Sequence, residues 1–144
     1  MPHTNIEQLI SMIFTTSRLI RERAKNREKI DPFSFLQLET LRYVAEKGDP
    51  SMKNVADYLY ITPPSATSLI NSLVKTKQLE RIHDKDDRRL VRLVITPKGK
   101  TALASGFKKI TTRMRRLLSN LDAKEKDNLF KILEKLARAN QKQP

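Results

Sequence analysis

Short polar side chains are concentrated in one segment near the middle of the chain, between residues 62 and 75. Its residues with candidate binding roles are Pro63, Ser65, Thr67, Ser68, Asn71, Ser72 and Lys75. Hydroxyl, amide and ammonium groups of this kind can reach base edges and phosphates when a helix lies in the major groove of DNA. A second interpretation stays open at this point, in which the segment is an ordinary packed helix with a solvated polar face.

A cationic turn follows this segment. Its basic residues are Arg81, Arg88, Arg89 and Arg92, and its acidic residues are Asp84, Asp86 and Asp87. Arginine is the side chain best suited to the negative potential of a minor groove. We expect one of the carboxylates to orient an arginine through a bidentate pair. In isolation such a turn is most often only solvated, but beside the polar helix it favours a finger that contacts DNA.

The elements that must position these groups are predicted from hydrophobic periodicity and capping residues. Helices are expected over residues 6–24, from Ser34 to Lys47, from Ser51 to Leu59, and over 62–75. Ser34, Ser51 and Thr62 are candidate N-caps, and Gly48 is a suitable helix stop. Two further helices are expected after Thr96-Pro97 and after Leu121-Asp122.

A β-hairpin is predicted between the fourth and fifth helices. Leu79, Ile82 and His83 indicate one strand, and the β-branched run from Leu90 to Ile95 indicates the second. The element order is therefore α-α-α-α-β-β-α-α, which is mainly α with a small β-hairpin. Two short helices followed at once by a hairpin are typical of a winged helix-turn-helix, here over residues 34–98 of a single domain spanning 1–144.

Buried faces can be assigned from the same patterns. The second helix is expected to bury Phe35, Leu38, Leu41, Val44 and Ala45, and the fourth helix Ala66, Leu69, Ile70, Leu73 and Val74. The long helices within 5–30 and 99–139 are too apolar along one face to stay exposed on a small monomer. We expect them to pack on each other and on a second subunit, which would make the protein a homodimer.

The charge balance favours a polyanionic partner. The 144 residues include 29 Lys and Arg against 16 Asp and Glu, a net charge of +13. Nucleic acid is the commonest such partner, and an anionic membrane surface is the competing interpretation. No apolar run approaches the length needed to span a bilayer, so we expect a cytoplasmic protein without a membrane partner.

The residues that catalysis or metal binding would need are largely missing. There is no cysteine, which excludes disulfides and thiolate zinc sites, and His3 and His83 are the only histidines. No Gly-rich phosphate loop or nucleophile elbow occurs. The sequence therefore predicts no enzyme activity, no metal site and no cofactor.

The segment from Asp87 to Gly99, DRRLVRLVITPKG, resembles the wing signature of the MarR family, an Asp-x-Arg followed by a strand ending in Leu-Thr and a nearby Gly. The strand and wing entry from Leu79 to Asp87 are also similar to that family. The resemblance extends from about Ile6 to Leu136, including helix order and length. Two departures concern Ser68 and Ser72, where family members often have Arg, and Gln78, which replaces a common Gly.

The resemblance implies a dimeric, usually repressing transcriptional regulator that binds a short palindromic operator in double-stranded DNA. Thr62 to Lys75 would enter the major groove, Asp87 would orient the wing, and Arg88 and Arg89 would reach the minor groove. Many members lose DNA affinity when a small aromatic or anionic effector binds. The residues expected at such a site are Phe14, Ser17, Arg18 and Tyr43.

Two rivals remain at this point. A basic protein of the same fold could coat DNA without sequence preference, and a protein–protein adaptor could have lost DNA binding. A large affinity difference between a palindrome and random DNA separates the regulator from the coating protein. Replacing Arg88 and Arg89 with Ala separates it from the adaptor, which should be indifferent.

Overall fold

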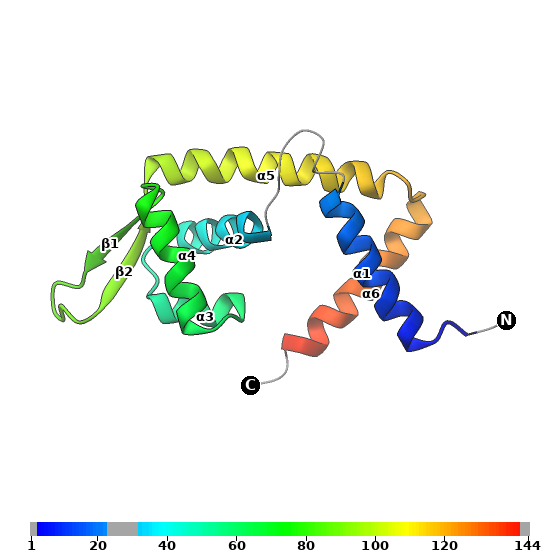
Figure 1. The fold of residues 1–144 in the computed structure, drawn as a ribbon, viewed down its shortest axis with the longest axis horizontal. Coiled ribbons are helices and arrows are strands. Elements are labelled where there is room, and N and C mark those ends of the chain that lie inside the picture. Colours follow the sequence, from blue (N-terminus) through cyan, green and yellow to red (C-terminus); the bar gives the residue numbers. More distant parts are fainter. Residues whose placement is uncertain (1–2, 23–31, 142–144) are drawn as a thin grey trace. The chain divides into compact units, whose positions relative to one another are not determined.

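The computed structural model describes residues 3–22 and 32–141. The elements in this part of the chain are α1 (Ile6–Glu22), α2 (Pro32–Lys47), α3 (Met52–Leu59), α4 (Pro63–Lys75), β1 (Leu79–His83), β2 (Val91–Ile95), α5 (Pro97–Leu118) and α6 (Ala123–Gln141) (Figure 1). This order confirms the predicted helices and hairpin. Two compact units are distinguished, Met1–Leu103 and Ala104–Pro144, and the boundary falls within α5. In the described ranges no helix combines the length and the apolar character needed to cross a membrane.

The short helices α3 and α4 begin at the predicted caps. The Ser51 hydroxyl accepts a hydrogen bond from the Asn54 backbone N–H at 3.1 Å, and the Asn54 side chain accepts one from the Ser51 N–H at 3.0 Å. This reciprocal pair satisfies two backbone donors that a helix start leaves unpaired. Thr62 likewise accepts from the Ser65 N–H, and Pro63 follows at the first helical position, where a missing N–H costs nothing.

The start of α2 differs from the prediction. The helix begins at Pro32, so Ser34 lies inside its first turn and is not the N-cap. A proline is compatible with the first turn of a helix, because the backbone N–H there has no intrahelical acceptor. The predicted end is confirmed, since Gly48 has a positive φ of 89° and its N–H donates to the Val44 carbonyl at 2.9 Å. The predicted extension of the first helix to residue 24 lies outside the described residues.

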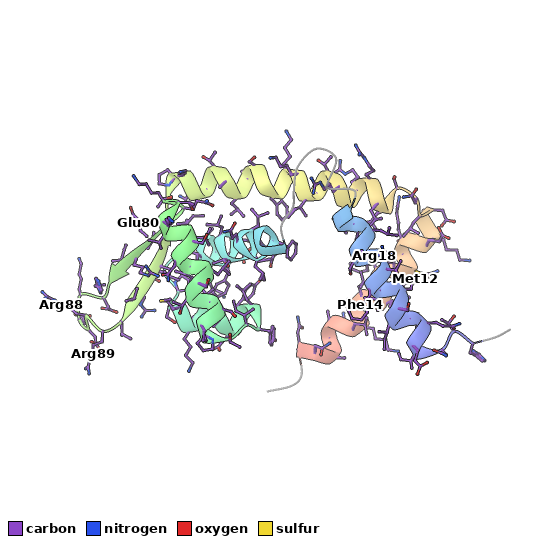
Figure 2. All side chains as sticks on the ribbon, viewed as in Figure 1. Met12, Phe14, Arg18, Glu80, Arg88 and Arg89 are labelled. Carbon is purple, nitrogen blue, oxygen red and sulfur yellow. The ribbon has the colours of Figure 1, made fainter. Side chains whose placement is uncertain are left out.

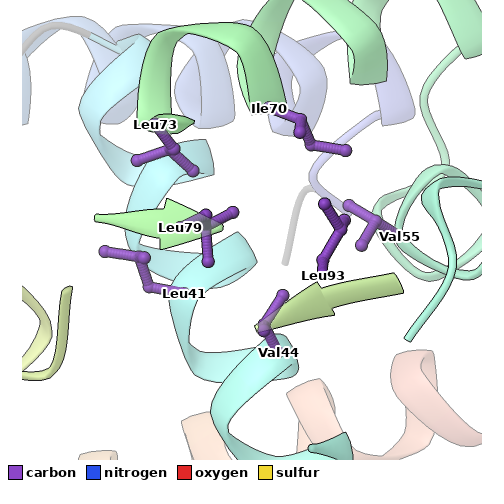
Figure 3. Packing of buried hydrophobic residues seen from close by; sticks show 7 residues of the cluster. All are labelled: Leu41, Val44, Val55, Ile70, Leu73, Leu79 and Leu93. Atoms are coloured by element: carbon purple, nitrogen blue, oxygen red, sulfur yellow. The ribbon is translucent and has the colours of Figure 1, made fainter. Parts of the chain in front are cut away.

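A single apolar cluster joins α2, α3, α4 and the hairpin (Figure 3). Its fully buried members are Leu41, Val44, Val55, Ile70, Leu73, Leu79 and Leu93. Because Leu79 and Leu93 come from the two strands, the hairpin is anchored to the same core as α4. The fourth-helix stripe is confirmed by buried Ala66, Leu69, Ile70 and Leu73.

Three residues expected in this core are outside the buried cluster, and all lie on α2. Phe35 is 50% exposed, Ala45 is also exposed, and Leu38 is half-buried. The α2 positions that meet α3, α4 and β2 are filled by Leu41 and Val44, and the buried stripe of α2 is narrower than its apolar composition suggests. Which apolar residue is covered therefore depends on the neighbouring elements as well as on helical periodicity.

The turn from α4 into β1 explains how Gln78 replaces glycine. The left-handed backbone conformation is adopted by Lys77, with a φ of 60°, and Gln78 needs no positive φ. The Gln78 carbonyl accepts from the Thr96 N–H at 3.1 Å, which closes the base of the hairpin. Close packing at this point makes Gly99 necessary, because a Cβ there would lie 2.1 Å from the Gln78 carbonyl oxygen.

The hairpin itself is a regular antiparallel pair. Leu79 faces Ile95, Arg81 faces Leu93, and His83 faces Val91. The second strand begins at Val91, one residue later than predicted. An N–H···O bond of 2.9 Å from Leu93 to the Pro50 carbonyl ties β2 to the segment that precedes α3.

The apolar residues of the end helices remain exposed. On α6 they include Phe130 at 67% and Leu133 at 55%, and no residue of α6 is buried. On α1, Ile6 and Phe14 are 67% and 69% exposed. Within the described chain, each of these helices therefore has apolar side chains that stay exposed to solvent.

Candidate nucleic-acid interface

The helix α4 is divided cleanly into a buried side and a polar side. Its buried residues belong to the core, whereas Ser65, Thr67, Ser68, Asn71 and Pro63 are exposed, as predicted. Ser72 is the exception. It is half-buried, and its hydroxyl oxygen accepts a hydrogen bond of 3.2 Å from the Gln37 side chain on α2. Ser72 thus connects α4 to α2 and is turned partly away from the exposed face.

Several hydroxyl groups on the polar side already donate within the helix. Thr62 donates to the Ser65 hydroxyl oxygen at 2.9 Å, and Thr67 donates to the Pro63 carbonyl at 3.0 Å. Their oxygens keep lone pairs, but these two hydroxyl protons are occupied. Ser65 accepts in this pair and keeps its own proton, so the donors left on the exposed side are supplied by Ser65, Ser68, Asn71 and Lys75.

The far end of the hairpin is a turn built by its aspartates. One oxygen of Asp87 accepts both from the Arg89 backbone N–H at 3.0 Å and from its Nε at 3.2 Å. Asp84 in turn accepts from the Asp86 N–H at 3.0 Å. The expected pairing of an aspartate with an arginine therefore occurs at Asp87. It is not bidentate, because a single carboxylate oxygen makes both contacts.

The arginines of the hairpin differ in whether a carboxylate pairs with them. Arg92 lies 3.8 Å from the Asp84 carboxylate, and Arg89 pairs with Asp87 while its side chain stays 92% exposed. Arg88 is exposed, and no ion pair of its side chain is found among the described residues. Figure 2 shows Arg88 and Arg89 at the free end of the hairpin, away from the core. The hairpin thus presents an exposed cationic tip.

Arg81 and Asn71 form a contact that sequence reasoning did not foresee. The Arg81 guanidinium, on β1, donates a hydrogen bond to the side-chain oxygen of Asn71 on α4. Both side chains are exposed. The alternation of side chains along the strand could have predicted which side of the hairpin Arg81 faces. Arg81 comes two residues after buried Leu79 and therefore points to the same side of the hairpin.

Not every exposed cation is available for DNA. Arg42 on α2 is hydrogen-bonded to Glu46 at 3.2 Å and lies near Glu39, and the two carboxylates raise the pKa of Arg42. Its charge is balanced locally. Apart from Arg42, the arginines of residues 34–98 all lie on the hairpin, whereas α4 contributes a single cation, Lys75.

The residues expected to bind an effector are distributed over two helices. Phe14, Ser17 and Arg18 lie on α1, with Phe14 and Arg18 exposed and Ser17 half-buried (Figure 2). Tyr43 lies on α2, is half-buried, and stacks on Tyr58 of α3 with ring centroids 4.3 Å apart. The effector pocket stays a prediction. Over residues 3–22 and 32–141, no cluster of acidic and histidine side chains is suited to hold a metal ion.

The sequence is similar to known regulators. Residues 32–90 match the model of the MarR family. The uncharacterized HTH-type transcriptional regulator YsmB of Bacillus subtilis is 25% identical over 115 residues, which cover 78% of this chain and 76% of that protein.

The fold is similar to that of solved regulators. The wild-type MarR from E. coli, in its apo form, has a TM-score of 0.71 at 20% identity, covering 94% of this chain and 98% of that one. The PcaV transcriptional regulator from Streptomyces coelicolor, solved in complex with its natural ligand, has a TM-score of 0.71 at 17% identity, covering 97% and 99%. The winged-helix segment thus matches the model of the MarR family, the chain is similar in sequence to an HTH-type transcriptional regulator, and its fold is that of solved MarR and PcaV regulators.

Proposed function

We propose that the protein is a cytoplasmic, homodimeric repressor that recognises a palindromic operator in double-stranded DNA and is released by a small effector. In this proposal residues 34–98 bind DNA, with α4 in the major groove and the hairpin tip in the adjacent minor groove. The helices within 5–30 and 99–139 supply the dimer contacts.

The observation that carries this proposal is the common anchoring of two candidate DNA-binding elements. Leu73 of α4 and Leu79 and Leu93 of the hairpin are buried in one cluster. A polar helix face and an exposed arginine tip are therefore held at a set spacing on one core. Such a fixed spacing suits simultaneous binding in neighbouring grooves of a duplex.

The homodimer is supported by the uncovered apolar faces. Phe130, Ile132, Leu133 and Leu136 of α6 are each more than half exposed. Contiguous apolar surface of this kind is rarely left open on a monomer and usually marks an interface. A second copy of the chain would also supply the second α4 that a palindrome requires.

Release by an effector is supported by less direct observations. Phe14, with Arg18 one helical turn further along α1, offers an aromatic and a cationic group, which suits a small aromatic or anionic molecule. PcaV from Streptomyces coelicolor is solved with a natural ligand, and it has the same fold. We propose that Phe14, Ser17, Arg18 and Tyr43 contribute to such a site.

Selection of bound fragments from a random duplex library at physiological salt tests the proposal. We expect an enriched inverted repeat whose half-sites are about one helical turn apart. Retention of DNA without an enriched motif would replace the proposal with non-specific coating of DNA. Failure to retain any duplex would favour an adaptor without DNA binding.

A further inference from the structure

We propose that Asn71 determines sequence specificity by reading the N7 atom of one purine in each half-site, and that Arg81 positions it for this task. The inference rests on the proposed sequence-specific binding. It assigns the two residues different roles, since Asn71 contacts the base and Arg81 acts through Asn71.

The direction of the contact follows from the chemistry of the two groups. The Arg81 guanidinium donates to the Asn71 side-chain oxygen. Arginine carries donors and no acceptor, so only the oxygen of the amide can face it. The NH₂ group of Asn71 is therefore directed away from Arg81 and presents its donors to the surroundings.

The strand that carries Arg81 is anchored by its buried neighbours. Arg81 pairs with Leu93 on β2 and follows Leu79 by two residues, so the three side chains share the face of the hairpin that meets α4. Leu79 and Leu93 are 1% and 0% exposed. No carboxylate pairs with Arg81 in the described chain, so its full charge remains beside the amide and polarises it.

Asn71 is the oriented donor of the polar side of α4. The Thr67 hydroxyl proton is used on the Pro63 carbonyl, and Ser72 is half-buried and accepts from the Gln37 side chain. Ser65 and Ser68 have hydroxyls that rotate, and Lys75 has a flexible ammonium group. Discrimination between bases needs a donor with a defined direction, and the Asn71 amide has one.

A fixed amide donor fits the major-groove edge of a purine. Adenine and guanine present the N7 acceptor there and thymine presents O4, whereas cytosine presents an amino donor that an amide NH₂ cannot satisfy. Of these acceptors, the adenine N7 is the one with an amino donor beside it, which matches both polar atoms of an amide. The second lone pair of the Asn71 oxygen remains open to a donor such as the adenine amino group. We therefore expect one purine position per half-site whose recognition depends on N7.

The experiment uses the selected operator with its purines replaced one at a time by the 7-deaza analogues, which lack only the N7 acceptor. Binding of the full chain is measured at constant salt for the wild type, Asn71→Ala, Arg81→Ala and Arg88→Ala. Arg88→Ala is the matched control, because it also removes one exposed arginine of the hairpin. Circular dichroism checks that each variant is folded.

At one purine position the wild type should bind the 7-deaza operator roughly ten-fold more weakly than the natural operator. Asn71→Ala and Arg81→Ala should bind both operators with similar, reduced affinity, whereas Arg88→Ala should keep the ten-fold ratio. An Arg81→Ala variant that keeps the ratio would overturn the positioning role. A wild type that tolerates every 7-deaza substitution would overturn N7 reading, and a wild type without any selected operator would overturn the proposed function as well.

Discussion

The winged-helix core and the last helix of the chain bury their apolar side chains to very different degrees. In the core, Leu41, Ile70 and Leu93 are no more than 1% exposed. In α6, Leu133 and Leu136 are 55% and 57% exposed, and no residue is buried. The first region completes its packing within one chain, whereas the second has an apolar face that only another surface can cover. The spacing of α4 and the hairpin is thus set within the single chain, whereas the proposed recognition of two half-sites would require a second copy.

The largest loss of stability should come from creating a cavity in the buried core. Leu93→Ala removes a fully buried side chain from β2 and leaves a cavity among close-packed neighbours. We expect the free energy of unfolding, measured by urea denaturation, to fall by about 3 kcal/mol. Leu90→Ala is the control on the same hairpin, because Leu90 is 47% exposed, and it should cost well under about 1 kcal/mol. Equal losses in the two variants would refute the assignment of the core.

A charge on the exposed apolar face of α6 should weaken the association of the two subunits. Leu133→Asp would place an unpaired carboxylate in the proposed interface, so we expect the dimer dissociation constant to rise by about 100-fold. Sedimentation equilibrium measures this change. Lys131→Asp introduces the same side chain on the polar side of the same helix and should leave the dimer in place. A Leu133→Asp protein that stays dimeric would show that α6 does not pair subunits.

Loss of a helix cap should weaken α4 by a smaller amount. Thr62→Ala removes the side-chain acceptor for the Ser65 N–H at the start of the helix. The expected loss is about 1 kcal/mol of unfolding free energy. Thr62→Ser keeps the acceptor and should recover most of the stability. If serine restores nothing, the cap does not stabilise the helix.

The smallest effect should come from a surface ion pair on α6. Arg138 lies 2.6 Å from Glu134, but their side chains are 72% and 43% exposed. Removing the pair with Arg138→Ala should change the unfolding free energy by less than about 0.5 kcal/mol, because solvent screens exposed charges. Thermal melts in low and high salt should differ little between variant and wild type. A loss above about 1 kcal/mol would indicate that the Arg138–Glu134 pair is itself buried against a second subunit, so that the proposed interface on α6 reaches this pair.

Local features of this fold were predictable from the sequence. Ser51 and Thr62 cap their helices because capping depends on the side chain and the next three residues. The stripe of Leu69, Ile70 and Leu73 follows helical periodicity, and it is buried as expected. Element order and the hairpin followed from the same short-range patterns.

Features that depend on contacts between elements could not be predicted in the same way. The exposure of Phe35 depends on which neighbours reach α2, and periodicity alone does not say this. The bond from Gln37 to Ser72 joins residues 35 positions apart, and it changes the role expected for Ser72. The contact between Arg81 and Asn71 likewise requires the hairpin to return along α4. The hydrogen-bond partners that the candidate residues have on other elements therefore could not be predicted from the sequence.

The proposed function depends on this protein binding one DNA sequence selectively and not coating DNA of any sequence. Its most direct test is the dissociation constant for the selected inverted repeat and for a scrambled duplex of equal length and composition, at one salt concentration. A sequence-specific regulator should bind the inverted repeat at least about 10³-fold more tightly. Equal affinities for the two duplexes would instead show that the protein coats DNA.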